Sequence, residues 1–256
     1  MSVTSDLSDV LEQKTVDAHF KHPFTCVVVG PSESGKTTFV SHLLEYLDHE
    51  FTDVIIYLGT PAEQNSIFQE LLERQHHFNL NMVNLYEKYG DAPAESAQFS
   101  KDIELLCKMM FDEKKKLCLV FDDLMSQLAD CSVLSDLFTK KSAHTKTSVI
   151  YITQNLFHKG KKTSENVTIY RNTKYLVLFR SGLDQTTFQV VAKRINVPTQ
   201  FLVDVTNTHR YIVIRADQKG PKFTTQLFET LTLEDGQRIP VQLQVEPILK
   251  NKKSKK

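Results

Sequence analysis

The sequence predicts an α/β fold: a three-layer αβα sandwich in which helices cover both faces of a mostly parallel β-sheet. Short apolar runs of strand length recur along the 256 residues, and segments with apolar residues at helical spacing separate them. This alternation is typical of parallel sheets, whose strands are buried on both faces. The expected strands are 24–29, 53–58, 117–121, 148–153, 175–179 and 211–214, and the clearest expected helices are 36–47 and 186–195.

One domain with an extension at each end is the expected organisation. Residues 1–20 are polar and weakly patterned, the domain is predicted to span 21–218, and 219–256 form a short C-terminal extension. That extension ends in KNKKSKK, a basic tail that either binds DNA, directs nuclear import or only aids solubility. Because the formal net charge is zero, the rest of the chain is acidic. Overall charge therefore gives no indication of a nucleic-acid partner.

The composition is that of an ordinary globular protein, with 41% hydrophobic and 24% charged residues. No apolar run approaches the roughly 20 residues of a membrane span, and the first residues do not resemble a secretory signal. We therefore expect an intracellular protein. The cysteines Cys26, Cys107, Cys118 and Cys131 lack the spacing of a zinc site, so reduced, buried thiols are expected.

A phosphate-binding loop is the most specific feature of the sequence. The segment GPSESGKT fits the pattern G-x-x-x-x-G-K-[ST], follows an apolar strand and precedes a helix. In such a P-loop, or Walker A motif, Lys36 reaches the β- and γ-phosphates of ATP, and the Thr37 hydroxyl binds Mg²⁺. A glycine turn before a helix is the alternative. The candidate nucleotide-binding residues are Gly30, Pro31, Ser32, Glu33, Ser34, Gly35, Lys36, Thr37 and Thr38, the last also explicable as ordinary helix.

Two acidic residues follow the apolar run LCLVF in the pattern of a Walker B motif. Asp122 is the candidate Mg²⁺ ligand, and Asp123 is the candidate base that polarises the attacking water. Asp123 is shorter than the glutamate more usual at this place, and a strand that ends in a solvated turn is the alternative. The long separation from Gly30, with the strand 53–58 in between, suggests that a strand separates the two motifs in the sheet. This arrangement is that of P-loop ATPases of the additional-strand catalytic-glutamate type.

A polar residue at the tip of the next strand is placed to sense the γ-phosphate, and Gln154 follows 148–153. Taken alone, a glutamine at a strand end is more often a plain cap.

Four segments give the chain a resemblance to the genome-packaging ATPases of the FtsK/HerA superfamily, above all to those of Maverick/Polinton elements and adintoviruses, and further off to poxvirus packaging ATPases. They are CVVVGPSESGKTTF, LVFDDLM, LFTKKSAHTKTSVIYITQNLFHKGK and NTKYLVLFRSGLD. The resemblance implies a P-loop ATPase domain in 21–218, hydrolysis of ATP with Mg²⁺, and translocation of double-stranded DNA into a capsid. It also implies a homo-oligomeric ring, a capsid or portal partner, and a place in the host nucleus, a viral factory or the virion. Gln154 gains its sensor role from this match.

The chain departs from the family at the end of its next strand, where SGLD lacks the arginine of the usual Pro-Arg-Asp turn. Rings of this kind need a cation from the neighbouring subunit to stabilise transition-state charge. Arg180 is the first candidate, followed by Arg171 and Arg194, and a solvated surface arginine is the alternative for each.

Basic residues in two loops are candidates for contact with the DNA backbone, and both loops are expected near the nucleotide end of the sheet. They are Lys140, Lys141, His144 and Lys146, and His158, Lys159, Lys161 and Lys162. Solvated loops are the alternative. Two other classes of protein stay open: a small-molecule kinase, and a nucleotide-binding assembly protein without turnover.

Overall fold

The computed structural model describes residues 20–59, 61, 65–90, 97–122, 124, 132–156, 163–182, 185–216, 222–225, 229–232 and 238–241. The strands are β1 (Thr25–Val29), β2 (Asp53–Leu58), β3 (Asn79–Asn84), β4 (Leu117–Asp122), β5 (Ser148–Thr153), β6 (Tyr175–Phe179), β7 (Tyr211–Arg215), β8 (Lys222–Thr225), β9 (Glu229–Thr232) and β10 (Arg238–Val241). The helices are α2 (Lys36–Tyr46), α3 (Ser66–Glu73), α4 (Leu85–Tyr89), α5 (Ala97–Asp112), α7 (Ser132–Asp136), the π-helical turn η3 (Leu137–Lys141), α8 (Ser142–His144), α9 (Thr163–Arg171), α10 (Gln185–Ile195) and α11 (Thr199–His209).

Eight strands form one sheet in the order β3-β2-β4-β5-β1-β6-β7-β8. The strands from β3 to β6 pair in parallel, whereas β7 runs antiparallel to β6, and β8 runs antiparallel to β7. β9 and β10 form a separate antiparallel pair. The sheet is therefore mostly parallel, as the alternation of strands and helices predicted. Because β8 belongs to it, the sheet continues past residue 218, where the domain was expected to end.

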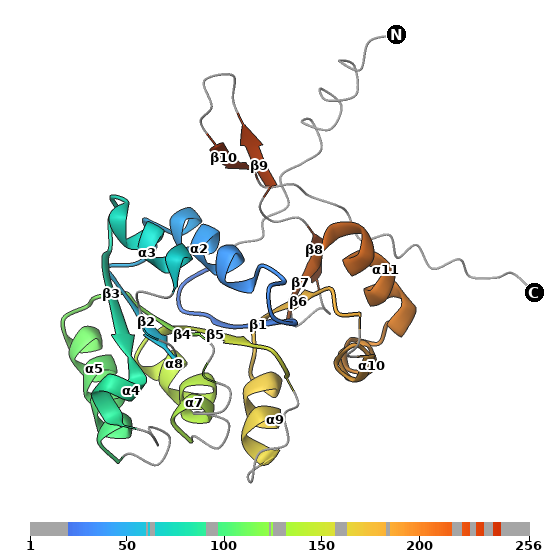
Figure 1. Cartoon of the computed structure of the whole chain (residues 1–256). Coiled ribbons are helices and arrows are strands. Elements are labelled where there is room, and N and C mark those ends of the chain that lie inside the picture. The colour runs from blue at the N-terminus through green and yellow to red at the C-terminus, as the bar shows by residue number, and fades with distance from the viewer. Residues whose placement is uncertain are drawn as a thin grey trace, which may run out of the picture.

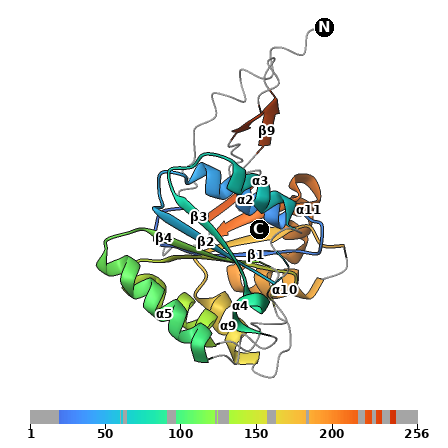
Figure 2. The same ribbon diagram turned by 60° about the vertical axis from the view of Figure 1, so that its left-hand side comes forward.

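Helices cover both faces of the sheet, which confirms the predicted sandwich (Figure 1). On one face α2 and α3 pack against a core cluster that includes Val28, Leu43 and Phe68. On the other face α5, α7 and α9 pack against a second cluster, to which α10 and α11 also contribute. A view turned by 60° shows the same two layers on either side of the strands (Figure 2).

β5 lies between β1 and β4 in the sheet. A strand does separate the phosphate-loop strand from the acidic strand, as the sequence suggested. The separating strand follows both motifs in the chain, and β2, which precedes the acidic motif, lies on the far side of β4. The carboxyl ends of β1, β4 and β5 consequently meet at one edge of the sheet.

Three cysteines are buried and free, as predicted: Cys26 in β1, Cys118 in β4 and Cys107 in α5. Burial raises the pKa of each thiol above its ordinary value. Cys131 lies outside the described residues. Among the helices that the structure describes, none has both the length and the apolar run that a membrane crossing requires.

A partly buried histidine, His22, lies at the amino end of the sheet. Its Nδ1 is 2.8 Å from the Ser148 hydroxyl, which also accepts a hydrogen bond from the Phe24 N–H at 3.2 Å. Either of the two atoms can donate in the contact between Nδ1 and the hydroxyl. Burial, aided by the positive charges of Lys116 and Lys146, lowers the His22 pKa from 6.5 to about 4.

The lowered pKa of His22 predicts a loss of stability in mild acid. Between pH 6.5 and 4 the unfolded chain binds a proton that the folded chain does not, so the free energy of unfolding falls as pH falls through this window. Replacement of His22 by glutamine removes the titrating group. Urea unfolding at pH 7 and pH 4.5 should show a smaller acid loss in His22→Gln than in the wild type, and equal losses would contradict the assignment.

Candidate active site

The loop between β1 and α2 has the backbone of a tight phosphate-binding turn. Glu33 and Gly35 take positive φ angles of 61° and 98°, and the Ser34 N–H donates to the Pro31 carbonyl at 3.4 Å. The Gly30 N–H donates to the Thr153 carbonyl at 3.3 Å, which fixes the start of the loop to β5. The loop leads directly into the N-terminus of α2, where the free N–H groups and the helix dipole favour an anion.

Gly30 is required by a close approach of β6. A Cβ atom at this position would lie 2.5 Å from Phe179 Cβ, closer than real contacts allow, and 3.0 Å from Ser34 Oγ, which is also tight. Phe179 itself packs edge-on against Phe39 of α2, with ring centroids 6.1 Å apart. The first glycine of the motif therefore makes room for packing beneath the loop.

The lysine of the motif is buried at the loop. The Lys36 side chain is 9% exposed, and its Nζ donates to the Pro31 carbonyl at 2.6 Å. In the same loop, the Ser34 hydroxyl is buried without a hydrogen-bond partner in the part of the chain that the structure describes. A buried ammonium and an unsatisfied hydroxyl at one loop fit a bound anion, because phosphate oxygens accept from both.

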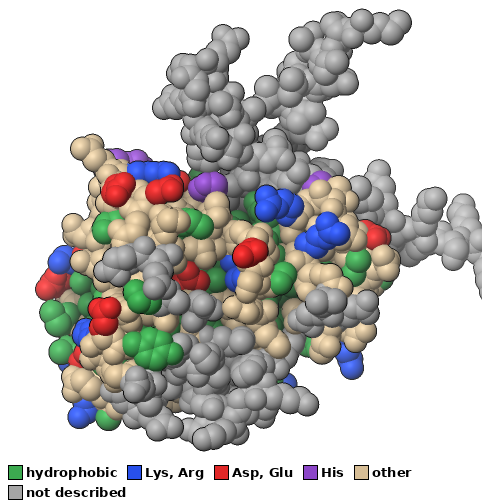
Figure 3. Space-filling view, in the orientation of Figure 1, with side chains coloured by type: hydrophobic (Ala, Val, Ile, Leu, Met, Phe, Trp, Pro, Cys, Tyr) green, Lys and Arg blue, Asp and Glu red, His purple; other side chains and the backbone are tan. Residues whose placement is uncertain are grey.

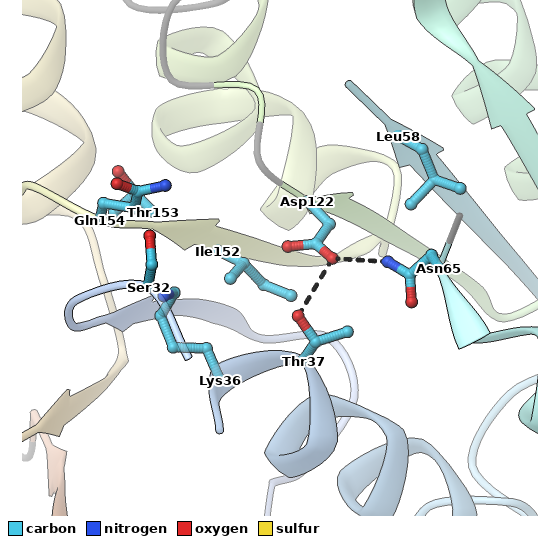
Figure 4. Close-up of a pocket in the computed structure, with 9 residues that line it drawn as sticks. All are labelled: Ser32, Lys36, Thr37, Leu58, Asn65, Asp122, Ile152, Thr153 and Gln154. Atoms are coloured by element: carbon cyan, nitrogen blue, oxygen red, sulfur yellow. Dashed lines mark hydrogen bonds between the residues drawn. The ribbon is translucent and has the colours of Figure 1, made fainter. Parts of the chain in front are cut away.

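Asp122 joins three elements of the site (Figure 4). Its side chain ends β4, is 5% exposed, and accepts hydrogen bonds at 3.3 Å from Thr37 Oγ1 and from Asn65 Nδ2. Thr37 belongs to the first turn of α2, and Asn65 caps the N-terminus of α3. Carboxylate and hydroxyl oxygens are the ligands that Mg²⁺ prefers. The pair Asp122 and Thr37 therefore suits a magnesium ion.

These groups line one open pocket of about 200 Å³. Figure 4 shows Ser32 and Gln154 at one end of it, and Asp122 with Asn65 at the other. Gln154 follows β5 directly, as the sequence predicted, and is exposed. The lining residues are Ser32, Lys36, Thr37, Leu58, Asn65, Asp122, Ile152, Thr153 and Gln154. The structure thus brings together the phosphate loop, the predicted metal carboxylate and the predicted sensor.

The other predicted site residues either lie near this pocket or fall outside the described residues. Thr38 is exposed on α2, next to Thr37. Asp123 lies outside the described residues, so its role as the base stays a prediction. Arg180 is exposed just beyond β6, the strand beside β1, at the same edge of the sheet as the phosphate loop.

The two other candidate arginines, Arg171 and Arg194, lie towards the amino end of β6, at the side of the sheet opposite the phosphate loop. Arg171 ends α9, just before β6 begins. Arg194 donates to the backbone carbonyls of Tyr170 and Arg171, and its guanidinium lies 4.2 Å from the centre of the Tyr170 ring. Arg194 therefore holds α10 against the end of α9.

One of the two predicted DNA-binding loops is not near the nucleotide end of the sheet. Lys140, Lys141, His144 and Lys146 precede β5, and Ser148, which starts this strand, pairs beside the start of β1 and β4. They lie at the amino end of the strands, whereas the phosphate loop follows the carboxyl end. That part of the prediction was wrong, because in a parallel sheet a segment that directly precedes a strand lies at the amino end, whereas phosphate loops follow the carboxyl end. The second loop, 157–162, lies outside the described residues.

Sequence reasoning missed Asn65, which lines the pocket, and Arg210, which lies beside the phosphate loop. Asn65 lies in a long polar stretch with no motif, and its only signal is that asparagine is a favoured helix N-cap. Arg210 takes a positive φ of 64° after α11, and its Nη2 is 3.7 Å from where a Gly35 Cβ would be. Its carbonyl accepts the Arg180 N–H at 2.7 Å. Both arginines therefore lie on the side of the loop away from β4.

Asn65 performs two tasks that substitution can separate. Its Oδ1 accepts from the Phe68 N–H at 3.2 Å as an N-cap, and its Nδ2 donates to Asp122. Asn65→Ser keeps a capping oxygen but has no amide donor, whereas Asn65→Ala loses both, which should cost about 1 kcal/mol of stability. We expect both variants to weaken Mg²⁺-dependent nucleotide binding, and the alanine variant alone to melt earlier. Wild-type nucleotide binding by Asn65→Ser would show that the contact with Asp122 has no role.

Comparisons with known proteins bear on the fold and the family of the chain. Among solved structures, the DNA-packaging ATPase B204 from Sulfolobus turreted icosahedral virus matches with a TM-score of 0.55 and 14% identity over 79% of this chain and 97% of that one. The genome packaging NTPase B204 from Sulfolobus turreted icosahedral virus 2, in complex with AMPPCP, matches with a TM-score of 0.53 and 12% identity over 78% and 96% of the two chains. At these identities the likeness shows a shared fold. No curated protein sequence matches the chain significantly. The model of the family described as Poxvirus A32 protein matches residues 13–214.

Proposed function

The chain belongs to the poxvirus A32 protein family, and from this membership and its site we propose that it is an ATP-hydrolysing motor. It translocates double-stranded DNA and packages a viral or transposon genome into a capsid. The observation that carries the proposal is the meeting of the phosphate loop, Thr37 and Asp122 in one pocket. The fold shared with two virus packaging enzymes supports it.

ATP binding would use groups that are already in place. The loop N–H groups and the start of α2 would bind the phosphates, and Lys36 would exchange the Pro31 carbonyl for phosphate oxygens. Thr37 and Asp122 would hold Mg²⁺, which neutralises charge on the phosphates when bound.

Hydrolysis to ADP and phosphate adds three roles. Asp123 would orient the attacking water, and Gln154, at the pocket's other end from Asp122, would sense the γ-phosphate. Arg180 would act across the interface of a homo-oligomeric ring, on the nucleotide of a neighbouring subunit. Its exposure at the nucleotide edge of the sheet supports this role. The proposed partners are DNA, other copies of the chain and a capsid or portal protein, within the host cell or the virion.

DNA-stimulated hydrolysis is the first test of the proposal. Purified protein should turn over ATP with Mg²⁺, faster with double-stranded DNA, and Lys36→Ala should lose about 100-fold or more of this activity because the phosphates lose their cation. The affinity for DNA should fall steeply with added salt. Nucleotide binding without turnover, with or without DNA, would instead indicate an assembly protein. Phosphate transfer only to a small-molecule acceptor would indicate a kinase.

The proposed role of Arg180 predicts complementation between two inactive variants. Lys36→Ala loses its own phosphate site and Arg180→Ala loses the arginine offered to a neighbour, so a mixed ring contains some interfaces with both residues intact. Hydrolysis by the mixture should exceed that of either variant alone. Arg171→Ala, at the opposite edge of the sheet, is the matched control and should keep wild-type turnover. If Arg180→Ala alone is fully active, the arginine finger is another residue.

A further inference from the structure

We propose that Asp48, His49 and His77, together with His76, form a zinc site that joins the end of α2 to the segment between α3 and β3. The site lies away from the nucleotide pocket, and the proposal does not depend on the proposed function. Figure 3 shows histidine side chains beside charged ones at the surface over α2 and α3.

Three donor groups converge there. One ligand atom from each of Asp48, His49 and His77 lies within 4.8 Å of the other two. The rings of His49 and His77 have centroids 4.0 Å apart, and His77 Nδ1 contacts Asp48 Oδ2. The His77 backbone N–H also donates to Asp48 Oδ1 at 2.8 Å, which fixes the two segments to each other. Small changes in side-chain torsion would bring the donors to the spacing of a metal's ligands.

The orientation of His76 provides independent support. Its Nε2 lies 2.7 Å from the Leu71 carbonyl, and since a carbonyl accepts only, Nε2 must carry a proton. In the neutral ring Nδ1 is then a bare lone pair, 3.6 Å from Asp48 Oδ1. Two lone pairs facing each other repel, unless a second proton or a cation lies between them. A divalent ion that accepts from both atoms would remove this repulsion.

The donor set is that of zinc. Zn²⁺ takes four ligands in tetrahedral geometry, and imidazole nitrogens with a carboxylate oxygen are among its usual protein ligands. The His76 side chain is 7% exposed and that of His77 67%, so an ion can enter from solvent.

A metal here would act on the helical layer that carries the nucleotide site. α2 begins with Lys36 and Thr37, and α3 begins directly after Asn65. The far ends of the same two helices lead to Asp48 and His76. An ion that binds both ends would stabilise the layer from which Thr37 and Asn65 contact Asp122.

Titration of ZnCl₂ into the purified full chain by isothermal calorimetry tests the proposal. Excess Mg²⁺ is present to occupy the pocket at Asp122. We expect one zinc ion per chain, with His49→Ala and His77→Ala each weakening the affinity about 10-fold to 100-fold. Both side chains are exposed, so neither change should disturb folding. His144→Ala, an exposed histidine on α8, is the control and should bind zinc as the wild type does.

Thermal unfolding gives a second measurement. ZnCl₂ should raise the melting temperature of the wild type and of His144→Ala, but not of the double variant His49→Ala/His77→Ala, because a ligand of the folded state stabilises it. The double variant also measures any zinc bound elsewhere in the chain. Equal zinc affinity in wild type and double variant would overturn the proposal, as would an unchanged wild-type melting temperature. In the latter case a proton, and not a metal, lies between His76 and Asp48.

Discussion

The hydrogen bonds that converge on Asp122 determine how the nucleotide site is assembled. The carboxylate ends a central parallel strand and accepts from Thr37 at the start of one helix and from Asn65 at the start of another. A buried carboxylate without such donors would be costly, so the sheet and the two helices keep their positions together. The pocket forms because these hydrogen bonds join the end of β4 to the starts of α2 and α3.

The sheet was predictable wherever burial left a clear pattern. The central strands β1, β4, β5 and β6 are buried throughout and mostly apolar because both faces are covered, and the prediction placed each within a residue of its observed bounds. β3 was missed because NLNMVN alternates polar residues and only partly buries its side chains at the edge of the sheet. Strand order was not predictable in full, since sequence order does not say on which side of a neighbour a strand pairs.

The residues of the candidate site likewise fall into those that a local sequence pattern predicts and those that it does not. Residues in the phosphate loop and at strand ends were predictable, because phosphate and Mg²⁺ chemistry fixes both their type and their spacing. Lys36, Thr37, Asp122 and Gln154 accordingly meet in one pocket. Asn65 was not predictable, because it reaches Asp122 through the packing of α3 and not through any local pattern. The basic loop before β5 was placed at the wrong end of the sheet, although the predicted parallel direction of its strand already puts a preceding loop at the amino end.

The contact between Gly30 and Phe179 has a mechanical consequence. Phe179 is the last residue of β6, and its ring also lies 5.1 Å from that of Tyr211, the first residue of β7. Because the backbone at Gly30 packs directly against the Phe179 side chain, the loop cannot move towards β6 without a clash. A displacement of the β6–β7 pair would push on the phosphate loop, and a change in the loop would push back on the pair. Force applied to β6 and β7 is therefore transmitted to the nucleotide-binding loop through a single direct packing contact, that of Phe179 with Gly30.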